Sequence, residues 1–338
     1  MNSSYLWKHC KVLELTKNIR RFSETDVRVA EDITEFSKWI LDLGDGKINE
    51  PNNGECIIEI PKDLLITKSK DPIESIVSEV YGETFKDSKD PTFFQERAIL
   101  CPTNENVDVV NNYIFHYLCR LSCFNLNSTT KLLFINVGEE RIYLSSDSID
   151  PSDFNSRDDS IFSPEFLNSI KSSGLPSHAL RLKVGTPVMI LRYLEPNEGL
   201  CNGTRLQITH LGNHIVQAKV ITGTKVGQRV FLHRVLLTPT DTRLPFKMRR
   251  RQFPLKVAFA MTINKSQGQS LERVGLFLSR PVFSHGQLYV AFSRVKSRKG
   301  LKILITDNDG KPEESTMNVV YKEVFQNLLS SKFTQESH

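Results

Sequence analysis

The feature that most constrains the fold of this chain is a change of hydrophobic pattern partway along it. Up to about residue 124, short apolar runs typical of buried strands alternate with helical patterns, as in a parallel α/β sheet. From Arg181 the pattern changes to short β-type runs separated by glycine-containing turns such as Asn202-Gly203. After Pro245 the alternation of strand and helix returns. This order predicts one α/β domain interrupted by a small antiparallel β-barrel.

The expected elements follow from apolar runs and helical spacing. Buried strands are expected at residues 11–15, 56–60, 97–101, 255–262, 274–278 and 301–306, barrel strands at 184–191, 204–209, 215–221 and 229–232, and helices at 25–43, 73–81, 286–295 and from Thr103 or Asn104 onward. Trp39 is expected in the core. Residues 124–163 are rich in Ser, Asn and Asp and predict a long surface loop, and residues 308–317 predict a mobile loop.

Positive charge is concentrated in one part of the chain. The formal net charge is +5 over 338 residues, but residues 242–306 hold fourteen Lys or Arg and a single acid, Glu272. Such a stretch favours a polyanionic partner. The alternative is a solvated basic face balanced by acids elsewhere, for instance by residues 147–159. Within the stretch, Arg249–Arg251 is open to two interpretations, a nuclear-import patch or a segment facing a bound strand.

Cysteine usage predicts no metal site. The six cysteines show no zinc-type doublets, and Cys119 and Cys123, although at helical spacing, have no following ligand pair. A reducing compartment is the simplest inference. There is no leader pattern and no run near the roughly 18 apolar residues that span a bilayer, which predicts a protein that is neither secreted nor membrane-embedded.

Two segments near the C-terminus have the appearance of late motifs of a nucleic-acid motor ATPase. They are residues 259–271, with Asn-Lys-Ser-Gln-Gly-Gln at the centre, and residues 287–294, ending in Ser-Arg. The phosphate-binding pattern G-x-x-x-x-G-K-[ST] of such motors is absent, because neither Gly46-Lys47 nor Gly310-Lys311 has the second glycine spacing or the hydroxyl residue. The expectation is therefore the C-terminal half of a motor.

Seven strings, in order and with sensible spacing, give the resemblance its specificity. They are LxLTKNIR (13–20), ILCPTN (99–104), LKVGxPVM (182–189), GLCNGTR (199–205), RQFP (251–254), TINKSQGQ (262–269) and SHGQLYVA (284–291). Together they resemble the petite-integration-frequency DNA helicases, and more narrowly the Helitron-transposon branch, over about residues 5 to 306.

The resemblance implies an α/β fold with a RecA-like parallel sheet, interrupted by a Src-homology-three-like β-barrel. In the family, ATP and Mg²⁺ lie between two RecA-like domains, of which this chain would hold the second. The implied domains are the end of the first RecA-like domain and a hinge (1–24), the second RecA-like domain in two parts (25–163 and 246–310), the barrel insertion (164–245), and a C-terminal helix and tail (311–338).

The resemblance also implies an arginine finger. Phosphoryl transfer spreads negative charge over the γ-phosphate oxygens, and a planar guanidinium from the facing domain stabilises it. Arg294 is the first candidate and Arg20 the second, with Arg21 as the rival of Arg20. Phe292, where smaller residues are usual, is expected to crowd the finger.

The segment after the strand ending at Thr262 is the candidate sensor of DNA and nucleotide. Thr262, Lys265, Ser266 and Gln267 are expected to hold strand phosphates through hydroxyl, amide and ammonium donors. Gly268 and Gln269, with Arg294 and Arg20, are expected on the nucleotide side. The alternative is a polar connection with a solvated lysine.

For two further groups of residues, a contact with nucleic acid and a purely structural role are both open. Thr103 and Asn104 either contact phosphate at a helix N-terminus or only cap that helix. Lys183, Asn202 and Arg205 match family positions that line the DNA exit, although turn chemistry alone explains Asn202-Gly203. His285 is expected to pack at a helix start rather than to act in catalysis.

The function implied is the second motor domain of an ATP-dependent 5′-to-3′ DNA helicase acting in recombination, repair, telomere maintenance or transposition. Its partners would be single-stranded DNA or DNA junctions and the missing N-terminal RecA-like domain, in the nucleus or alternatively the mitochondrion. Without the phosphate-binding lysine and the magnesium-binding carboxylates, the chain alone is expected to bind ATP poorly. The alternatives are a catalytically inactive single-strand-binding module and a transposon remnant.

Overall fold

The computed structural model describes residues 27–49, 53–67, 71–82, 92–124, 140–150, 162–172, 174–239, 244 and 246–322. Two compact units are present. The first, here the α/β unit, comprises residues 1–80, 99–106 and 262–338, and the second, here the β-rich unit, comprises residues 81–98 and 107–261. The chain therefore leaves the α/β unit and returns to it, as the change of sequence pattern predicts.

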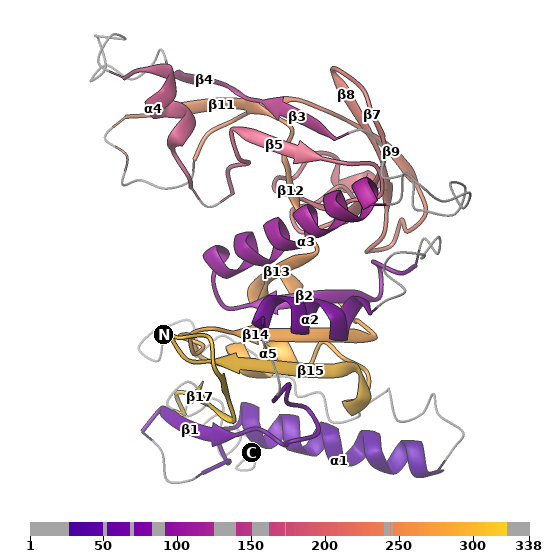
Figure 1. Cartoon of the computed structure of the whole chain (residues 1–338), viewed down its shortest axis with the longest axis vertical. Coiled ribbons are helices and arrows are strands. Elements are labelled where there is room, and N and C mark those ends of the chain that lie inside the picture. Colours follow the sequence, from indigo (N-terminus) through magenta and orange to yellow (C-terminus); the bar gives the residue numbers. More distant parts are fainter. Residues whose placement is uncertain are drawn as a thin grey trace, which may run out of the picture. The chain divides into compact units, whose positions relative to one another are not determined.

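The central strands of the α/β unit belong to a mixed sheet of order β13-β2-β14-β15-β16. Its strands are β13 (Ala260–Thr262), β2 (Arg97–Cys101), β14 (Arg273–Leu278), β15 (Leu301–Thr306) and β16 (Pro312–Glu313). The central strands β14 and β15 run parallel, and Figure 1 shows them side by side. Most of their residues are buried, as expected for strands covered on both faces. The predicted strands at 97–101, 274–278 and 301–306 are confirmed.

Three α-helices lie largely within the described part of this unit. They are α1 (Val27–Gly44), α2 (Pro72–Tyr81) and α5 (Gln287–Phe292). On α1 the residues at helical spacing, Ile33, Phe36, Ile40 and Leu43, are all buried. Glu31, Asp32, Glu35 and Lys38 are exposed, so the amphipathic pattern in the sequence located this helix correctly.

The second strand predicted for the parallel sheet has a different partner. β1 (Glu55–Glu59) pairs antiparallel with β17 (Ser315–Val319) in a separate two-stranded sheet. This pairing also corrects the mobile loop predicted at 308–317, which contains β16 and the start of β17. Sequence pattern alone cannot report this, because both strands are short and their pairing joins segments about 260 residues apart. The predicted strand at 11–15 and Arg20 lie outside the described residues.

The β-rich unit contains three antiparallel sheets. Their orders are β12-β6-β7-β8-β9, β10-β11-β4 and β3-β5. Figure 1 shows β7, β8 and β9 as neighbouring strands. The strands are β3 (Arg141–Leu144), β4 (Ser146–Ile149), β5 (Ala179–Leu182), β6 (Pro187–Ile190), β7 (Arg205–Leu211), β8 (Ile215–Val220), β9 (Arg229–His233), β10 (Val235–Leu237), β11 (Met248–Gln252) and β12 (Leu255–Val257), with helices α3 (Asn104–Phe124), which starts in the α/β unit, α4 (Pro164–Ser169) and the short η5 (Pro196–Glu198).

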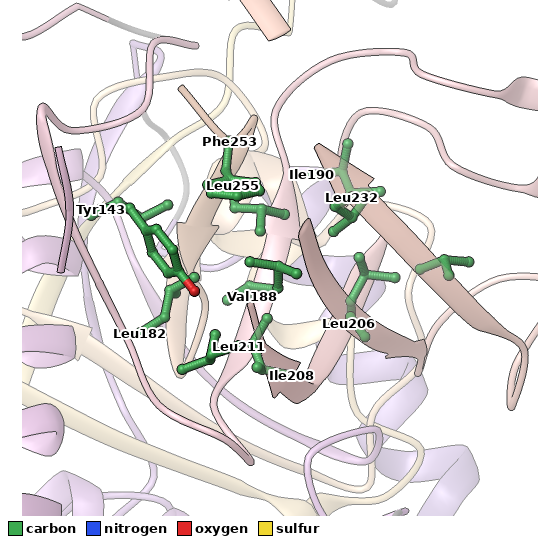
Figure 2. Close-up of a cluster of buried hydrophobic side chains, with 14 of the residues drawn as sticks. Tyr143, Leu182, Val188, Ile190, Leu206, Ile208, Leu211, Leu232, Phe253 and Leu255 are labelled. Carbon is green, nitrogen blue, oxygen red and sulfur yellow. The ribbon is translucent and has the colours of Figure 1, made fainter. Parts of the chain in front are cut away.

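The alternating strands enclose an apolar core, drawn in Figure 2. Val188 and Ile190 of β6, Leu206 of β7 and Leu232 of β9 are buried in it. Tyr143 closes the core from β3 and donates a hydrogen bond from its hydroxyl to the Gly212 carbonyl at 2.7 Å. This core explains why the unit folds around short strands. The likeness to a Src-homology-three barrel stays a prediction.

The long surface loop predicted at 124–163 is wrong between residues 141 and 149, where β3 and β4 form. A buried ion pair anchors β4: the Arg250 guanidinium donates from Nη2 to Asp147 Oδ2 at 2.6 Å and from Nε to Oδ1 at 2.9 Å, with each side chain 1% exposed. Removing one partner would leave a buried charge unpaired, which is strongly unfavourable. The acids of this segment therefore do balance part of the basic stretch, and Arg250 is neither an exposed import signal nor a strand-facing residue.

The strand predicted at 255–262 is divided into β12 and β13. The side-chain amide of Asn111 on α3 interrupts the strand: its Nδ2 donates to the carbonyls of Val257 and Ala260, and its Oδ1 accepts from the Ala260 amide at 2.8 Å. β12 pairs with β6 in the β-rich unit instead of continuing the parallel sheet. The strands at 141–149 and 248–257 thus lie outside the boundaries predicted for the insertion.

We expect Gly275→Ala to destabilise the α/β unit. Gly275 lies in β14, where an added Cβ would stand 2.5 Å from Val80 Cγ2 and 2.9 Å from Ile76 Cδ1 of α2. The overpacking should lower the free energy of unfolding by about 1–3 kcal/mol in urea denaturation. Val80→Ala removes the nearest atom, so the double variant should lose less stability than the sum of the two single variants. Strict additivity would show that α2 does not pack on Gly275.

Candidate nucleotide and nucleic-acid site

The segment after β13 forms a compact loop on the α/β unit. Residues Ile263–Ser266 make one 3₁₀ turn, η6, in which the Ser266 hydroxyl donates to the Ile263 carbonyl at 2.6 Å. Gly268 follows with φ of +82°, a conformation that favours glycine, and a Cβ there would meet nothing within 4 Å. The backbone at Gly268 therefore faces open space, where another group can approach it closely.

Arg294 connects this loop to α5. Its Nη1 donates to the Gln269 carbonyl at 3.1 Å and to the Ser266 carbonyl at 3.5 Å. Its Nε donates to the Val290 carbonyl at 2.8 Å, and its Nη2 donates to the Ser293 hydroxyl at 2.7 Å. These acceptors are carbonyl and hydroxyl oxygens, and together they orient the guanidinium. A shift of the loop would therefore move the guanidinium, because the two are hydrogen-bonded.

Helix α5 is held in place by aromatic packing. Phe292 is fully buried and stacks on Trp39 of α1, with ring centroids 5.2 Å apart and ring planes 15° apart. Tyr289 contacts α1 closely, since a Cβ on Gly44 would stand 2.7 Å from its ring. The expected crowding of the finger by Phe292 is therefore wrong, because the ring is stacked on Trp39. His285 lies at the helix start, as expected, with Nδ1 accepting from the Tyr321 amide.

The loop presents a mixed polar surface. Lys265 and Gln267 are exposed, and partial burial lowers the pKa of the Lys265 ammonium. Ser266 is fully buried and its hydroxyl is bonded to Ile263, so it does not present the phosphate-holding hydroxyl that was expected. Thr262 is half-buried. Of the four side chains expected to hold phosphate, those of Lys265 and Gln267 are thus exposed, next to the backbone of Gly268.

An ion pair fixes the segment that follows Arg294. Arg298 donates from Nε and Nη2 to the two carboxylate oxygens of Asp63 at 2.7 and 2.8 Å. The hydrogen bond from Arg298 lowers the pKa of the Asp63 carboxyl. Both side chains are partly exposed, so the pair contributes mainly to orientation.

The residues predicted at the start of α3 show capping geometry. The Asn106 amide donates to the Thr103 hydroxyl at 3.4 Å, the bond of an N-cap residue. Asn104 is the first residue of the helix. Capping therefore accounts for Thr103, and a phosphate contact at this helix stays a prediction.

The three residues predicted at the DNA exit lie in the β-rich unit and differ in accessibility. The Arg205 side chain is fully buried and donates from Nη2 to the carbonyls of Arg97 and Ala258. Lys183 is 6% exposed, and its ammonium lies 5.3 Å from the centroid of the Phe115 ring. Asn202 is exposed in a turn with Gly203 at φ of +96°. Asn202 is therefore the exposed member of the three, whereas Arg205 is buried and bonds to the backbone carbonyls of neighbouring segments.

Sequence reasoning did not identify the groups that orient Arg294. Ser293 precedes the arginine and supplies a hydroxyl acceptor, and Gln269, expected on the nucleotide side, supplies a backbone carbonyl. A carbonyl has no sequence signal, and only the adjacency of Ser293 to Arg294 could have indicated this role. Among the described residues there is no group of three or more His, Cys, Asp or Glu that could hold a metal ion. In the same part of the chain no helix has the length and apolar character needed to cross a bilayer.

Two family models match parts of the chain. Residues 1–54 match the PIF1-like helicase family, and residues 165–211 match the 2B domain of DNA helicase Pif1. The human ATP-dependent DNA helicase PIF1 is 35% identical over 147 residues, which is 43% of this chain and 22% of that protein. Pif1 from Bdellovibrio bacteriovorus is 33% identical over 143 residues, 42% of this chain and 31% of that protein. The matched region is thus less than a third of either relative.

Solved structures agree at the level of the fold. A Pif1 structure from a study of DNA unwinding at forked double-stranded DNA has a TM-score of 0.52 at 18% identity, covering 99% of this chain and 58% of that one. Pif1 from Candida albicans has a TM-score of 0.50 at 22% identity, covering 90% and 59%. The predicted resemblance to PIF1-type helicases and the predicted RecA-like fold are confirmed.

We expect Ser266→Ala to act on stability. The substitution removes the hydroxyl that closes η6 and should lower the free energy of unfolding by about 1 kcal/mol in urea denaturation. Ser270→Ala, at an exposed position of the same loop, is the matched control and should change stability little. A Ser266→Ala variant of unchanged stability but weakened DNA affinity would instead assign the hydroxyl to the strand.

Proposed function

The chain resembles PIF1 helicases in sequence and in fold. From this resemblance we propose that the chain supplies the second motor domain of an ATP-dependent 5′-to-3′ DNA helicase. Relatives with the name ATP-dependent DNA helicase PIF1 support the activity. The proposed substrates are single-stranded DNA and DNA junctions. The proposed settings are recombination, repair, telomere maintenance or transposition in the nucleus, with the mitochondrion as the alternative.

The observation that carries the proposal is the oriented guanidinium of Arg294. Its described acceptors are carbonyl and hydroxyl oxygens, and its neighbour in space is the loop that exposes Gly268. A guanidinium held in a fixed orientation can stabilise the negative charge that develops on the γ-phosphate oxygens. In this proposal the upstream motor domain holds ATP and Mg²⁺, and Arg294 stabilises the charge that forms on transfer.

The same contacts give a route from DNA to nucleotide. A strand phosphate at Lys265 or Gln267 would bias the loop, and the loop carbonyls of Ser266 and Gln269 would move the arginine with it. The binding of one ligand then changes the affinity for the other.

The test is Arg294→Ala in the longest polypeptide that the gene encodes, with its own upstream motor domain. ATP turnover stimulated by single-stranded DNA should fall about 10³- to 10⁵-fold, whereas DNA affinity should change little. Arg294→Lys should also lose most turnover, because an ammonium lacks the planar fork.

Arg280→Ala is the matched control, since Arg280 is an exposed arginine of the same unit. It should leave turnover unchanged. Retained turnover in Arg294→Ala would remove the finger assignment, and equal losses in both variants would point to a general electrostatic effect.

A second candidate function is a single-strand-binding module without catalysis. It is favoured by the basic stretch at residues 242–306, which holds fourteen Lys or Arg. The 338-residue chain should then bind oligothymidylate with an affinity that falls steeply with salt, by about 0.7 in log–log slope for each phosphate contact. Binding without turnover in the longest gene product would favour the module, and no binding at low salt would favour an inactive remnant.

A further inference from the structure

The outer face of the β8–β9 hairpin carries an unusual pair of charges. Lys219 of β8 and Arg229 of β9 are directly opposite each other in the antiparallel register. Their side chains share the face away from the core, because the neighbouring Ala218 and Val230 are buried. Like charges at directly opposed positions of a sheet are destabilising. This pairing lowers the stability of the hairpin unless an anion binds there.

No protein group offsets this repulsion among the residues that the structure describes. Neither Lys219 nor Arg229 has an ion pair or a hydrogen bond from its side chain there. An acid comes close to the hairpin at Glu198, but its carboxylate accepts from Gln228 Nε2 at 2.7 Å. The two cations are therefore available to an external anion.

An exposed aromatic ring lies on the same strand. Phe231 is two residues from Arg229, on the same face of β9, and is 67% exposed. Strand β9 is the edge of its sheet, and its buried alternate residues, Val230 and Leu232, belong to the core of the unit. An exposed phenylalanine on an edge strand is unfavourable for solubility, and edge strands usually carry charge for that reason. A binding role explains why an aromatic residue is placed there.

Phe231 also lines a pocket of about 430 Å³ within the β-rich unit. Tyr193, 70% exposed, and Leu236, 56% exposed, line the same pocket, together with Arg192 and His233. One carboxylate, Glu195, is also in the lining. The pocket thus has two accessible aromatic rings with basic side chains beside it, and its volume suits a ligand the size of a nucleobase or larger.

We propose that this surface, formed by the β8–β9 hairpin and the adjoining pocket, binds an unpaired nucleic-acid strand. Bases would stack on Phe231 and Tyr193, and backbone phosphates would lie between Lys219 and Arg229. Single-strand sites combine these two elements, aromatic platforms for bases and cations for the backbone, and they tolerate any sequence. The opposed cations favour a polyanion over a peptide, which would use the rings but leave the repulsion in place.

The surface lies in the β-rich unit and includes neither Arg294 nor any residue of the loop after β13. The proposal goes beyond the motor role, because it gives the β-rich unit a nucleic-acid binding site of its own. The two ideas can also fail separately. Loss of ATP turnover in Arg294→Ala tests the motor, and strand binding without nucleotide tests the surface.

The first experiment measures the affinity of the 338-residue chain for a fluorescein-labelled oligothymidylate by anisotropy, without ATP. Phe231→Ala should weaken binding about five- to 160-fold, the range expected for a lost base stack. Phe231→Trp should retain binding. Leu144→Ala, at a position of similar exposure on β3, is the matched control and should bind as the unaltered chain does.

The second experiment separates binding from stability. Lys219→Gln should weaken binding and reduce the log–log salt slope by about 0.7, the amount for one phosphate contact. Because the substitution also relieves the repulsion from Arg229, the melting temperature should stay the same or rise. Lys171→Gln, an exposed lysine elsewhere in the β-rich unit, should change neither quantity. Lower affinity with a lower melting temperature would indicate damage to the fold and would overturn the assignment of Lys219.

The third experiment locates the strand. Ultraviolet crosslinking of a bromodeoxyuridine oligonucleotide, mapped by mass spectrometry, should give adducts on Tyr193 or Phe231. Adducts confined to residues 262–294, with unchanged affinity in Phe231→Ala, would overturn the proposal and leave the loop as the strand site. Binding of a labelled proline-rich peptide that is lost in Phe231→Ala, with no loss of oligothymidylate binding, would reassign the pocket to a protein ligand.

Discussion

The attachment of the Arg294 guanidinium to two loop carbonyls is the interaction on which the proposed motor function depends. It joins the loop after β13 to α5, two segments that are separated in sequence by β14. Arginine suits this task because its fork can donate several hydrogen bonds while its charge stays intact. The packing beneath it, Phe292 on Trp39, holds α5 against α1 and so fixes the base from which the arginine extends.

The β-rich unit follows a different physical logic. Its interior is fully apolar around Leu206 and Leu232, and its buried charges are held by specific oxygen acceptors, as Arg250 is by Asp147. A buried pair of this kind contributes little net stability but penalises any arrangement that separates it. The exterior of the β8–β9 hairpin, in contrast, leaves Lys219 and Arg229 opposed. On this face the two cations have no described carboxylate partner, which is the pattern of a surface that meets a polyanion.

Local pattern predicted those parts of the fold that local physics controls. The amphipathic spacing of Ile33, Phe36 and Ile40 located α1, and continuous apolar runs located β2, β14 and β15. Motif strings indicated the family and singled out Arg294. The sequence pattern predicted the wrong structure where a side chain distant in sequence decided the local backbone conformation. The Asn111 amide divides the run predicted as one strand into β12 and β13. The Asp147–Arg250 pair anchors β4 in a segment whose composition is typical of a loop.

The sequence by itself determined the order of the two kinds of structure and the resemblance to PIF1-type helicases, and it selected Arg294 as the candidate finger, because periodicity and motif spacing are written in consecutive residues. The tertiary structure alone decided which side chains can be reached. Burial removed Ser266 and Arg205 from the accessible set, and strand register brought Lys219 opposite Arg229 beside an exposed phenylalanine. Accessibility and opposition depend on contacts between residues far apart in the chain, and no local pattern encodes those contacts.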